Sequence, residues 1–447
     1  MTAAPRIRIA LILPRAGIYR YGTGAFSLFL RYSPMTLVTL AALVPPELDA
    51  DVSIFDEGIE VVHRDRISAD IVGITGITGA SHRTYAYADY FRSRGCYVVI
   101  GGVHATLLPE EAQEHADTVV TGQAFESWPR FLRDWAAGAP RRRYGAPRKL
   151  DFAHYRIPSR SLLKKKGYVT TNSTQAVFGC PNACEFCVTP VVCRAYQGRP
   201  IPQVIEDIAS MGGTYFAFVD PSPIENVRYA TDLYRAIVPL RKKWTGLATT
   251  RLVRHRELMD VMEESGCRGL LIGFESLSQG TNDAIRKGFS RVAEYHTLAR
   301  ELHRRGIAIM GCFVHGLDGD ERECFERTLD FVMEADIDLP RFTICTPFPG
   351  TPFFRRLKRE GRILTENWAL YDAQHVVFRP ARMSVETLEA GHHDIWRRAY
   401  TLGAMARRLA GSRTFLQFTV LANLAYRTYG RRLPAFSSEY MANRDAL

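Results

Sequence analysis

The sequence lacks long apolar runs and lacks the spacing of a disulfide framework. No apolar stretch approaches the roughly 18 residues that span a bilayer. The nine cysteines are an odd number without a disulfide pattern, which favours a reducing compartment. The first residues run directly into an apolar stretch and do not have the form of a signal peptide. These absences argue against a membrane-spanning or secreted protein, and we expect a cytoplasmic protein of two or three domains.

Positive charge is concentrated in two segments of the chain. The net charge is +11 at pH 7. Residues 138–168 hold ten Lys or Arg against one acid, and residues 395–447 hold nine Arg against two acids. A charge run is most often a solvated face, but it also attracts anionic partners. We therefore leave open a lipid-like or anionic small-molecule substrate and contact with a membrane surface, and we expect no nucleic acid partner.

Three cysteines, Cys180, Cys184 and Cys187, lie within eight residues in the run Phe-Gly-Cys-Pro-Asn-Ala-Cys-Glu-Phe-Cys. Three thiolates at this spacing can hold one face of a [4Fe-4S] cluster. The fourth iron then remains open, and an open metal position can bind a substrate. A structural zinc site is the alternative, but zinc needs four ligands and no Cys/His pair at matching spacing follows. Cys193 could be a stray fourth ligand, although we interpret it as a buried or loop thiol.

The cysteine run, with an aromatic residue before its last cysteine, resembles the radical S-adenosylmethionine superfamily. The resemblance implies that the amino and carboxylate groups of S-adenosylmethionine bind the open iron. One electron from the cluster then cleaves the sulfonium to a 5′-deoxyadenosyl radical. The resemblance also implies that Phe186 lies beside S-adenosylmethionine, and that an external donor of the flavodoxin or ferredoxin type reduces the cluster.

Strand-like and helix-like segments alternate over residues 6–136. This alternation predicts a parallel, doubly wound sheet. The predicted strands are 6–13, 51–55, 70–75, 97–100 and 118–121; the predicted helices are 35–44, 81–94 and 125–136. Ligands bind such sheets at the carboxyl ends of the strands, where the glycine-bearing loops 56–60, 75–78, 101–104 and 121–123 fall.

The order of these loops resembles the cobalamin-binding domain fused to many radical S-adenosylmethionine enzymes. The run Gly-Gly-Val-His-Ala-Thr at 101–106 is its most specific part. The resemblance assigns cobalamin to Asp56, Glu57, Gly58, Thr75, Thr78, Gly101, Gly102, His104 and Gly122. The alternative is that these glycines only turn the chain.

One position departs from cobalamin domains that offer histidine to cobalt through a D-x-H-x-x-G run. Gly58 stands where that histidine would be. The resemblance then implies a cobalamin with an open or water-bound lower face, or a domain that has lost cobalamin. His104 is the nearest other imidazole, but we interpret it as a loop histidine with an ordinary hydrogen bond.

After a basic linker at 138–170, six strand candidates alternate with helices. The strands are predicted at 174–179, 214–219, 246–250, 268–274, 307–314 and 341–345, which resembles the partial (β/α)6 barrel of the superfamily. Active sites of such barrels lie at the carboxyl ends of the strands. The resemblance implies that the S-adenosylmethionine residues there are Asp220, Thr249, Arg251, Glu275 and Ser276. A salt bridge between Asp220 and Arg251 is the alternative for those two residues.

The fold class predicted from these patterns is α/β. It comprises a doubly wound cobalamin domain at 1–137, the linker at 138–170, the radical barrel at 171–363 and a helical extension at 364–447. In the extension, residues 415–426 are apolar and flanked by arginines. This helix could lie in a membrane interface, but we favour packing on the barrel.

The resemblance implies a radical S-adenosylmethionine enzyme with a [4Fe-4S] cluster and cobalamin. The commonest chemistry of that class is methyl transfer to an unactivated carbon, and we expect a C-methyltransferase without an assigned general base. An oxidative cyclase or a rearrangement enzyme is the second hypothesis. An electron-transfer or scaffold protein with a closed cluster is the third.

Overall fold

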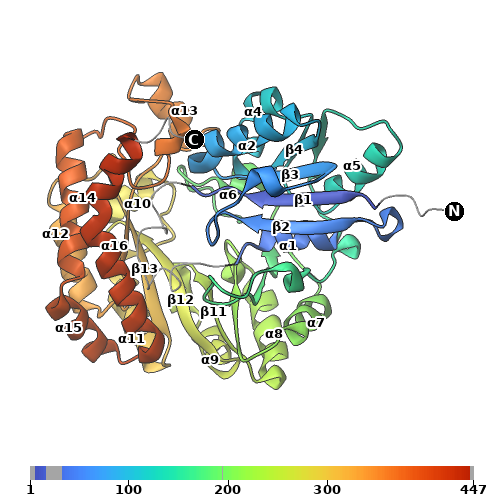
Figure 1. The fold of residues 1–447 in the computed structure, drawn as a ribbon. Helices are drawn as coiled ribbons and strands as arrows, with labels where there is room; N and C mark the ends of the chain where they lie inside the picture. The colour runs from blue at the N-terminus through green and yellow to red at the C-terminus, as the bar shows by residue number, and fades with distance from the viewer. Residues whose placement is uncertain (1–5, 17–32, 194, 443–447) are drawn as a thin grey trace.

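The computed structural model describes residues 6–16, 33–193 and 195–442, with side chains to Pro434. Two six-stranded parallel sheets form the molecule and lie side by side (Figure 1). The outer ends of the predicted first and last domains lie outside the described residues. No described helix is both long enough and apolar enough to cross a bilayer.

The N-terminal sheet has the order β2-β1-β3-β4-β5-β6, with every pair parallel. Its strands are β1 (Arg8–Leu13), β2 (Asp51–Asp56), β3 (Ile71–Thr75), β4 (Tyr97–Gly101), β5 (Thr118–Thr121) and β6 (Arg143–Gly145). The chain reverses its direction of winding between β1 and β3, and ligands bind at such a switch point.

Helices cover both faces of this sheet, because its strands are apolar on both sides. They are α1 (Met35–Ala42), α2 (Ser81–Ser93), α3 (Val103–Leu107), α4 (Pro109–His115) and α5 (Ser127–Ala136). Apolar residues of α1 and α5 belong to one core cluster, and those of α2 and α4 belong to another. The prediction of a doubly wound sheet is therefore confirmed.

The predicted linker is not only a connector. Its residues Arg143–Gly145 form β6 and pair with β5. Tyr144 is buried between two exposed neighbours, and three residues are too few to produce a visible alternation in the sequence. The remaining linker contains the 3-10 turns η6 (Phe152–His154) and η7 (Arg160–Leu162).

The second sheet has the order β14-β13-β12-β11-β10-β7 and is parallel throughout. Its strands are β7 (Ser173–Thr174), β10 (Tyr215–Phe218), β11 (Lys243–Ala248), β12 (Cys267–Glu275), β13 (Ala308–His315) and β14 (Arg341–Ile344). The helices between or after them are α7 (Ile201–Ser210), α8 (Val227–Ile237), α9 (Arg256–Glu264), α10 (Gln279–Ala284), α11 (Tyr295–Arg304), α12 (Cys324–Glu334) and α13 (Pro352–Arg359). The last five predicted barrel strands each overlap a strand of this sheet.

The first predicted barrel strand, 174–179, is wrong as a single strand. Only β7 belongs to the barrel sheet, whereas β8 (Val177–Phe178) pairs antiparallel with β9 (Gln197–Gly198). Between them lies the cysteine loop, residues 179–193, which includes the short helix α6 (Thr189–Val192). The cysteines are therefore held on a small two-stranded ribbon beyond the edge of the barrel.

The C-terminal extension packs on the barrel as three helices, α14 (Val385–Ala399), α15 (Leu402–Ser412) and α16 (Leu416–Ala442). Figure 1 shows α14 and α16 on the outside of the barrel beside α12. Trp396, Tyr426 and Tyr429 are buried in the barrel's main core cluster. The expectation of a packed helix at 415–426 is therefore confirmed.

Candidate functional site

The cysteine loop brings its three predicted ligands to the edge of the barrel. Cys180, Cys184 and Cys187 are free, half-buried thiols. Burial raises the pKa of Cys184 to about 12, although the Lys287 ammonium opposes the shift. Burial also raises the pKa of Cys187, against a hydrogen bond from Thr189. Bound iron would instead favour the thiolate form of these cysteines, because a coordinating thiol is deprotonated.

Among the described residues, no group of three or more His, Cys, Asp or Glu side chains has the geometry of a site for one metal ion. A cubane cluster sets a different requirement, since each thiolate binds a separate iron. Three free thiols in one loop are a donor set that fits a cluster with one open iron.

Two other residues of the cysteine loop have separate contacts. Gln123 Nε2 donates to Cys193 Sγ at 3.1 Å, so Cys193 contacts the N-terminal domain. This contact supports the interpretation of Cys193 as a loop thiol. Phe186 packs against an apolar cluster that contains Ile285, Leu317 and Phe353.

Asp220 lies beside the start of β8 and is fully buried. Its Oδ1 accepts hydrogen bonds from the backbone N–H groups of Ala176, at 2.8 Å, and Val177. These bonds turn the chain out of the barrel sheet towards the cysteine loop. Burial raises the pKa of Asp220 to about 7. Its Oδ2 is buried without a hydrogen-bond partner among the described residues.

The alternative salt bridge between Asp220 and Arg251 is wrong. Arg251 Nη1 instead lies 2.6 Å from Glu225 Oε2, whose side chain is 1% exposed. Thr249 Oγ1 donates to Glu225 Oε1 at 3.0 Å. Glu225 thus connects two predicted residues, and the sequence analysis missed it. Its only sequence signal was an acid in the loop after the second barrel strand.

Glu275 ends β12 in a left-handed conformation, with φ of 60°. The register of β12 against β13 shifts between Gly273 and Glu275. The Glu275 carboxylate pairs with Lys287, which also donates to Gly273 O at 3.0 Å. Ser276 Oγ accepts from the backbone of Ser278 at 3.1 Å. Lys287 is a further residue that the sequence analysis missed, because it comes 12 positions after its partner.

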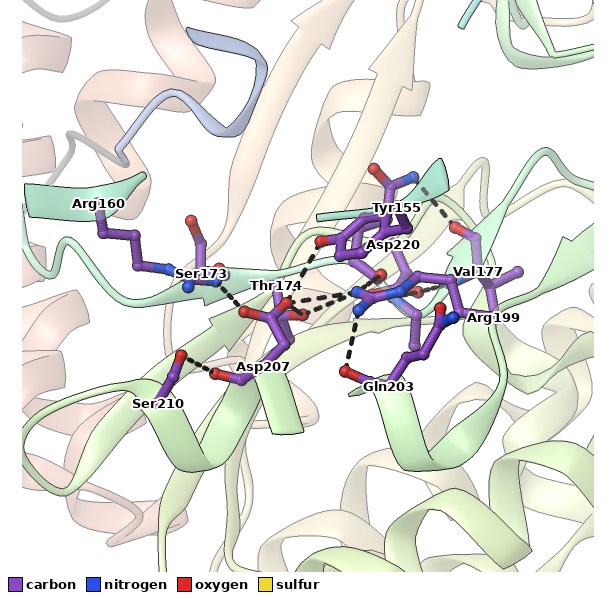
Figure 2. A network of polar contacts seen from close by, with 12 residues as sticks. Tyr155, Arg160, Ser173, Thr174, Val177, Arg199, Gln203, Asp207, Ser210 and Asp220 are labelled. Atoms are coloured by element: carbon purple, nitrogen blue, oxygen red, sulfur yellow. Dashed lines mark hydrogen bonds and ion pairs between the residues drawn. The ribbon is translucent and has the colours of Figure 1, made fainter. Parts of the chain in front are cut away.

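A buried ion network fixes the linker to the first barrel strand (Figure 2). The Asp207 carboxylate on α7 accepts from Arg160 Nη2 at 2.7 Å and from Arg199 Nη1 at 3.3 Å. It also accepts from Thr174 Oγ1 at 2.7 Å. The Arg199 guanidinium lies 3.5 Å from the centre of the Tyr155 ring. The basic linker was interpreted as a solvated face. This interpretation is wrong for Arg160, because its guanidinium pairs with the buried Asp207 carboxylate.

Four of the predicted cobalamin residues line one cavity at the carboxyl edge of the N-terminal sheet. Thr75, Gly101, Gly102 and Gly122 contribute to its wall, with side chains of α1 and α5. The cavity has a volume of about 190 Å³. Its other wall comes from Tyr155, Gln175, Phe178 and Val192 of the linker and the barrel entrance.

Gly102 shows why this edge needs glycine. Its φ is +94° and its ψ is −168°, a region open almost only to glycine. A Cβ there would lie 2.6 Å from Thr75 Oγ1. Glycine at 102 therefore lets this loop pack closely against Thr75, and it places no side chain of its own at the cavity wall.

The other five predicted cobalamin residues do not line this cavity. Asp56 accepts from Tyr168 and from the Gly58 backbone, and Glu57 pairs with Arg83. Thr78 is buried in η5 (Thr78–Ala80). His104 is buried, and its Nε2 lies 3.2 Å from Glu111 Oε1, which supports the interpretation of an ordinary loop histidine.

A second cavity lies between the edge of the N-terminal sheet and the end of the cysteine loop at residues 191–193. It has a volume of about 280 Å³ and shares Gly122, Gln123, Phe178 and Val192 with the first. Cys193 is also in its wall. The glycine-lined edge of the N-terminal sheet and the cysteine loop therefore border the same space.

Comparisons with known proteins agree with this geometry. The profile of the radical SAM superfamily matches residues 175–332, and that of a domain of unknown function (DUF4070) matches residues 351–424. The bacteriochlorophyllide d C-12(1)-methyltransferase of Chlorobaculum tepidum is 30% identical over 390 residues, covering 85% of each chain. The C-8(2)-methyltransferase of the same organism is 30% identical over 374 residues, covering 78% of this chain and 81% of that one.

Among solved structures, the cobalamin-dependent S-adenosylmethionine radical enzyme OxsB is similar, with a TM-score of 0.67 at 12% identity. The match covers 98% of this chain and 81% of that chain. At this identity the likeness shows the fold, which extends over both sheets.

A parallel partial barrel with three cysteines in the loop after β8, together with the match to the family profile, defines a radical SAM enzyme. Within that superfamily, the chain belongs to the family that includes the bacteriochlorophyllide methyltransferases of Chlorobaculum tepidum.

Proposed function

We propose that this protein transfers a methyl group to an unactivated carbon of a small-molecule substrate. The observation that carries the proposal is the shared cavity wall of Gly122 and Val192, which joins the glycine-lined sheet edge to the cysteine loop. A site of this kind lets two large cofactors face one substrate. The names of the similar methyltransferases support the same reaction class.

Each group has residues suited to hold it. Cys180, Cys184 and Cys187 would bind the [4Fe-4S] cluster, and Gly101, Gly102 and Gly122 would leave space for cobalamin. When bound, the cluster supplies the electron that cleaves S-adenosylmethionine, and cobalamin supplies the methyl group. In this proposal residues 1–137 serve cobalamin, and residues 171–363 serve the cluster and S-adenosylmethionine.

The protein's own side chains would position S-adenosylmethionine at the barrel rim. Asp220 Oδ2 offers an acceptor to its ammonium group, since no described residue uses that oxygen. Arg251 suits its carboxylate, because a guanidinium binds carboxylates through two parallel hydrogen bonds. The Arg251 side chain is 37% exposed despite its pairing with Glu225, so a ligand can reach it. Glu275 is available for ribose hydroxyls only on the side away from Lys287.

The substrate class is proposed from the names of the relatives and from exposed positive charge. Two relatives are named for bacteriochlorophyllide substrates, so we propose a large, ring-containing or lipid-like acceptor. The exposed Lys165 and Lys166 favour an anionic substrate or an anionic membrane surface. An external electron donor of the flavodoxin or ferredoxin type would reduce the cluster.

The test is anaerobic turnover with trideuteriomethyl-labelled S-adenosylmethionine and candidate acceptors. Methyl transfer predicts both S-adenosylhomocysteine and 5′-deoxyadenosine, with the label on a carbon of the acceptor. Deoxyadenosine with an altered but unlabelled acceptor would favour an oxidative cyclase or a rearrangement. Absence of S-adenosylmethionine cleavage by the reduced, reconstituted protein would favour a closed-cluster electron carrier.

A further inference from the structure

Glu185, between two of the predicted cluster ligands, is held from a distant part of the chain. Arg356 on α13 contacts its carboxylate with two nitrogens, Nε to Oε1 at 3.0 Å and Nη2 to Oε2 at 3.3 Å. This is the paired geometry in which guanidinium–carboxylate hydrogen bonds are strongest and most directional. The Glu185 side chain is 12% exposed, so water screens the pair only in part.

The backbone of Glu185 is fixed as well. Its N–H donates to Ile285 O at 3.0 Å, and its carbonyl accepts from the N–H of Phe353 at 3.1 Å. The next residue, Phe186, is packed in an apolar cluster that includes Phe353. The middle of the cysteine loop is therefore tied to the beginning of α13 through main chain and side chains.

Arg356 is itself positioned by a second acid. Its Nη1 lies 2.6 Å from Asp318 Oδ2, and Arg362 Nη2 lies 2.6 Å from Asp318 Oδ1. Asp318 stands in the loop after β13. Thr351 caps α13 by accepting the N–H of Phe354. These contacts fix the orientation of the guanidinium before it meets Glu185.

The same segment also reaches the other loop of the site. Trp368, in η12 (Trp368–Leu370), donates from Nε1 to Glu111 Oε2 at 3.0 Å. The other oxygen of Glu111 accepts from Tyr85 at 2.8 Å and lies 3.2 Å from His104 Nε2. His104 belongs to α3, directly after the glycines that line the first cavity.

We propose that residues 351–378, the clamp segment, hold the cysteine loop through Arg356 and the Gly101–His104 loop through Trp368, and so keep the two cofactor sites in register. The clamp segment falls within the stretch that matches a domain of unknown function. The inference rests on the proposed function for the identity of the two cofactors. Arg356 and Trp368 are positioning residues, because they act through Glu185 and Glu111.

The test for Arg356 is the rate of iron release from the reconstituted protein under an iron chelator, followed by the loss of cluster absorbance. Arg356→Gln should release iron at least about tenfold faster than wild type, because the loop can then detach a thiolate more easily. Arg356→Lys keeps the charge but loses the second hydrogen bond to the carboxylate. Its rate of iron release should lie between the rates of wild type and Arg356→Gln. Glu185→Gln should match Arg356→Gln, and the double variant should be no faster than either single variant.

Arg359→Gln is the matched control, since Arg359 is an exposed residue of the same helix, and its Nε donates to Arg355 O at 3.4 Å. It should release iron at the wild-type rate. Trp368→Phe should leave iron release unchanged and should speed cobalamin dissociation several-fold, measured by visible absorbance after gel filtration.

Equal iron release from the Arg356→Gln and Arg359→Gln proteins would overturn the proposal for the cysteine loop. Unchanged cobalamin dissociation in Trp368→Phe would overturn it for the second loop. A wild-type protein that assembles no [4Fe-4S] cluster would instead contradict the proposed function, so the two failures are distinguishable.

Discussion

Lys287 and Glu275 form an ion pair at the carboxyl end of β12, with 2.5 Å between Nζ and Oε1. Both side chains are at most 12% exposed. The Glu275 carboxylate helps to keep the pKa of Lys287 above its usual value, although burial alone would lower it. Cys184 of the cysteine loop lies within electrostatic reach of the same ammonium. The rim of the barrel thus places a buried cation beside the cluster cysteines.

Removing the Lys287 ammonium alone should therefore destabilise the folded protein. Lys287→Met leaves a buried carboxylate without its partner, and we expect a loss of about 3 kcal/mol. The double variant Lys287→Met with Glu275→Gln should recover part of this loss, because no charge is then stranded. The thermal unfolding midpoint of the reconstituted protein measures both effects.

Arg254→Met is the control for this prediction. Arg254 pairs with Glu294 in a more exposed setting, with side chains 36% and 31% exposed. Such pairs contribute at most about 1 kcal/mol. A midpoint for Lys287→Met as high as that for Arg254→Met would contradict the expected role of burial.

The second prediction concerns the three cluster ligands. Replacing Cys180, Cys184 or Cys187 with Ala should remove most of the iron and sulfide and abolish deoxyadenosine formation, because an iron would lose its thiolate. Cys193→Ala should keep the cluster, since its sulfur contacts Gln123. Iron analysis and electron paramagnetic resonance of the reduced proteins provide the measurement. Loss of the cluster from Cys193→Ala with retention in Cys184→Ala would reverse the ligand assignment.

The parts of the fold that could be predicted were those with a strong local pattern. The alternation of apolar strands and helices identified both parallel sheets. The 12-residue separation of Glu275 and Lys287, and the pairing of Glu225 with Arg251, leave no periodic signal, so these contacts were missed. Asp56 and Glu57 do not line the cavity, and their partners also could not be read from the sequence. The sequence placed both residues at the end of a strand. Tyr168, which donates to Asp56, and Arg83, which pairs with Glu57, come from distant segments.

Gly102 gives a third prediction, with its neighbour as the control. Gly102→Ala would place a Cβ 2.6 Å from Thr75 Oγ1 in a backbone conformation that alanine avoids, at a cost of about 1–3 kcal/mol. We expect cobalamin binding at least about tenfold weaker in an anaerobic spectrophotometric titration. Gly101→Ala meets its nearest protein neighbour, Val120 O, at 3.4 Å, so it adds a methyl group without backbone strain and should weaken binding less than Gly102→Ala. Equal affinities for the two variants would show that the backbone of Gly102 is not limiting.

The raised pKa of Asp220 should make the free energy of unfolding depend on pH. Burial raises its pKa from 3.8 to about 7 in the folded protein. Between these values the folded state binds more protons than the unfolded state, so stability falls as pH rises, by at most about 1.4 kcal/mol per unit. The contribution is fully present below pH 3.8 and is lost as the pH passes through 7.

Asp220→Asn tests this dependence, because the amide oxygen can still accept from Ala176 and Val177 and does not ionise. Its thermal midpoint should change less than that of wild type between pH 5 and 8 (roughly the range in which proteins are most stable), and should exceed it at the upper end. Parallel pH profiles of the two proteins would remove Asp220 as the source.

The state of cobalt is the last prediction. Gly58 occupies the position at which some cobalamin domains carry a ligating histidine, and its N–H donates to Asp56 Oδ1 at 2.8 Å. His104, the other candidate imidazole, is buried and lies 3.2 Å from Glu111. That carboxylate also binds Tyr85 and Trp368, and their hydrogen bonds together with that of His104 lower its pKa to about 2 although burial opposes the shift. His104 is thus held away from the cavity by a charged partner.

We expect the cob(II)alamin form to show no nitrogen superhyperfine splitting from protein in its electron paramagnetic resonance spectrum. His104→Ala should leave that spectrum unchanged. Nitrogen splitting that disappears in His104→Ala would show that this imidazole leaves Glu111 and binds cobalt.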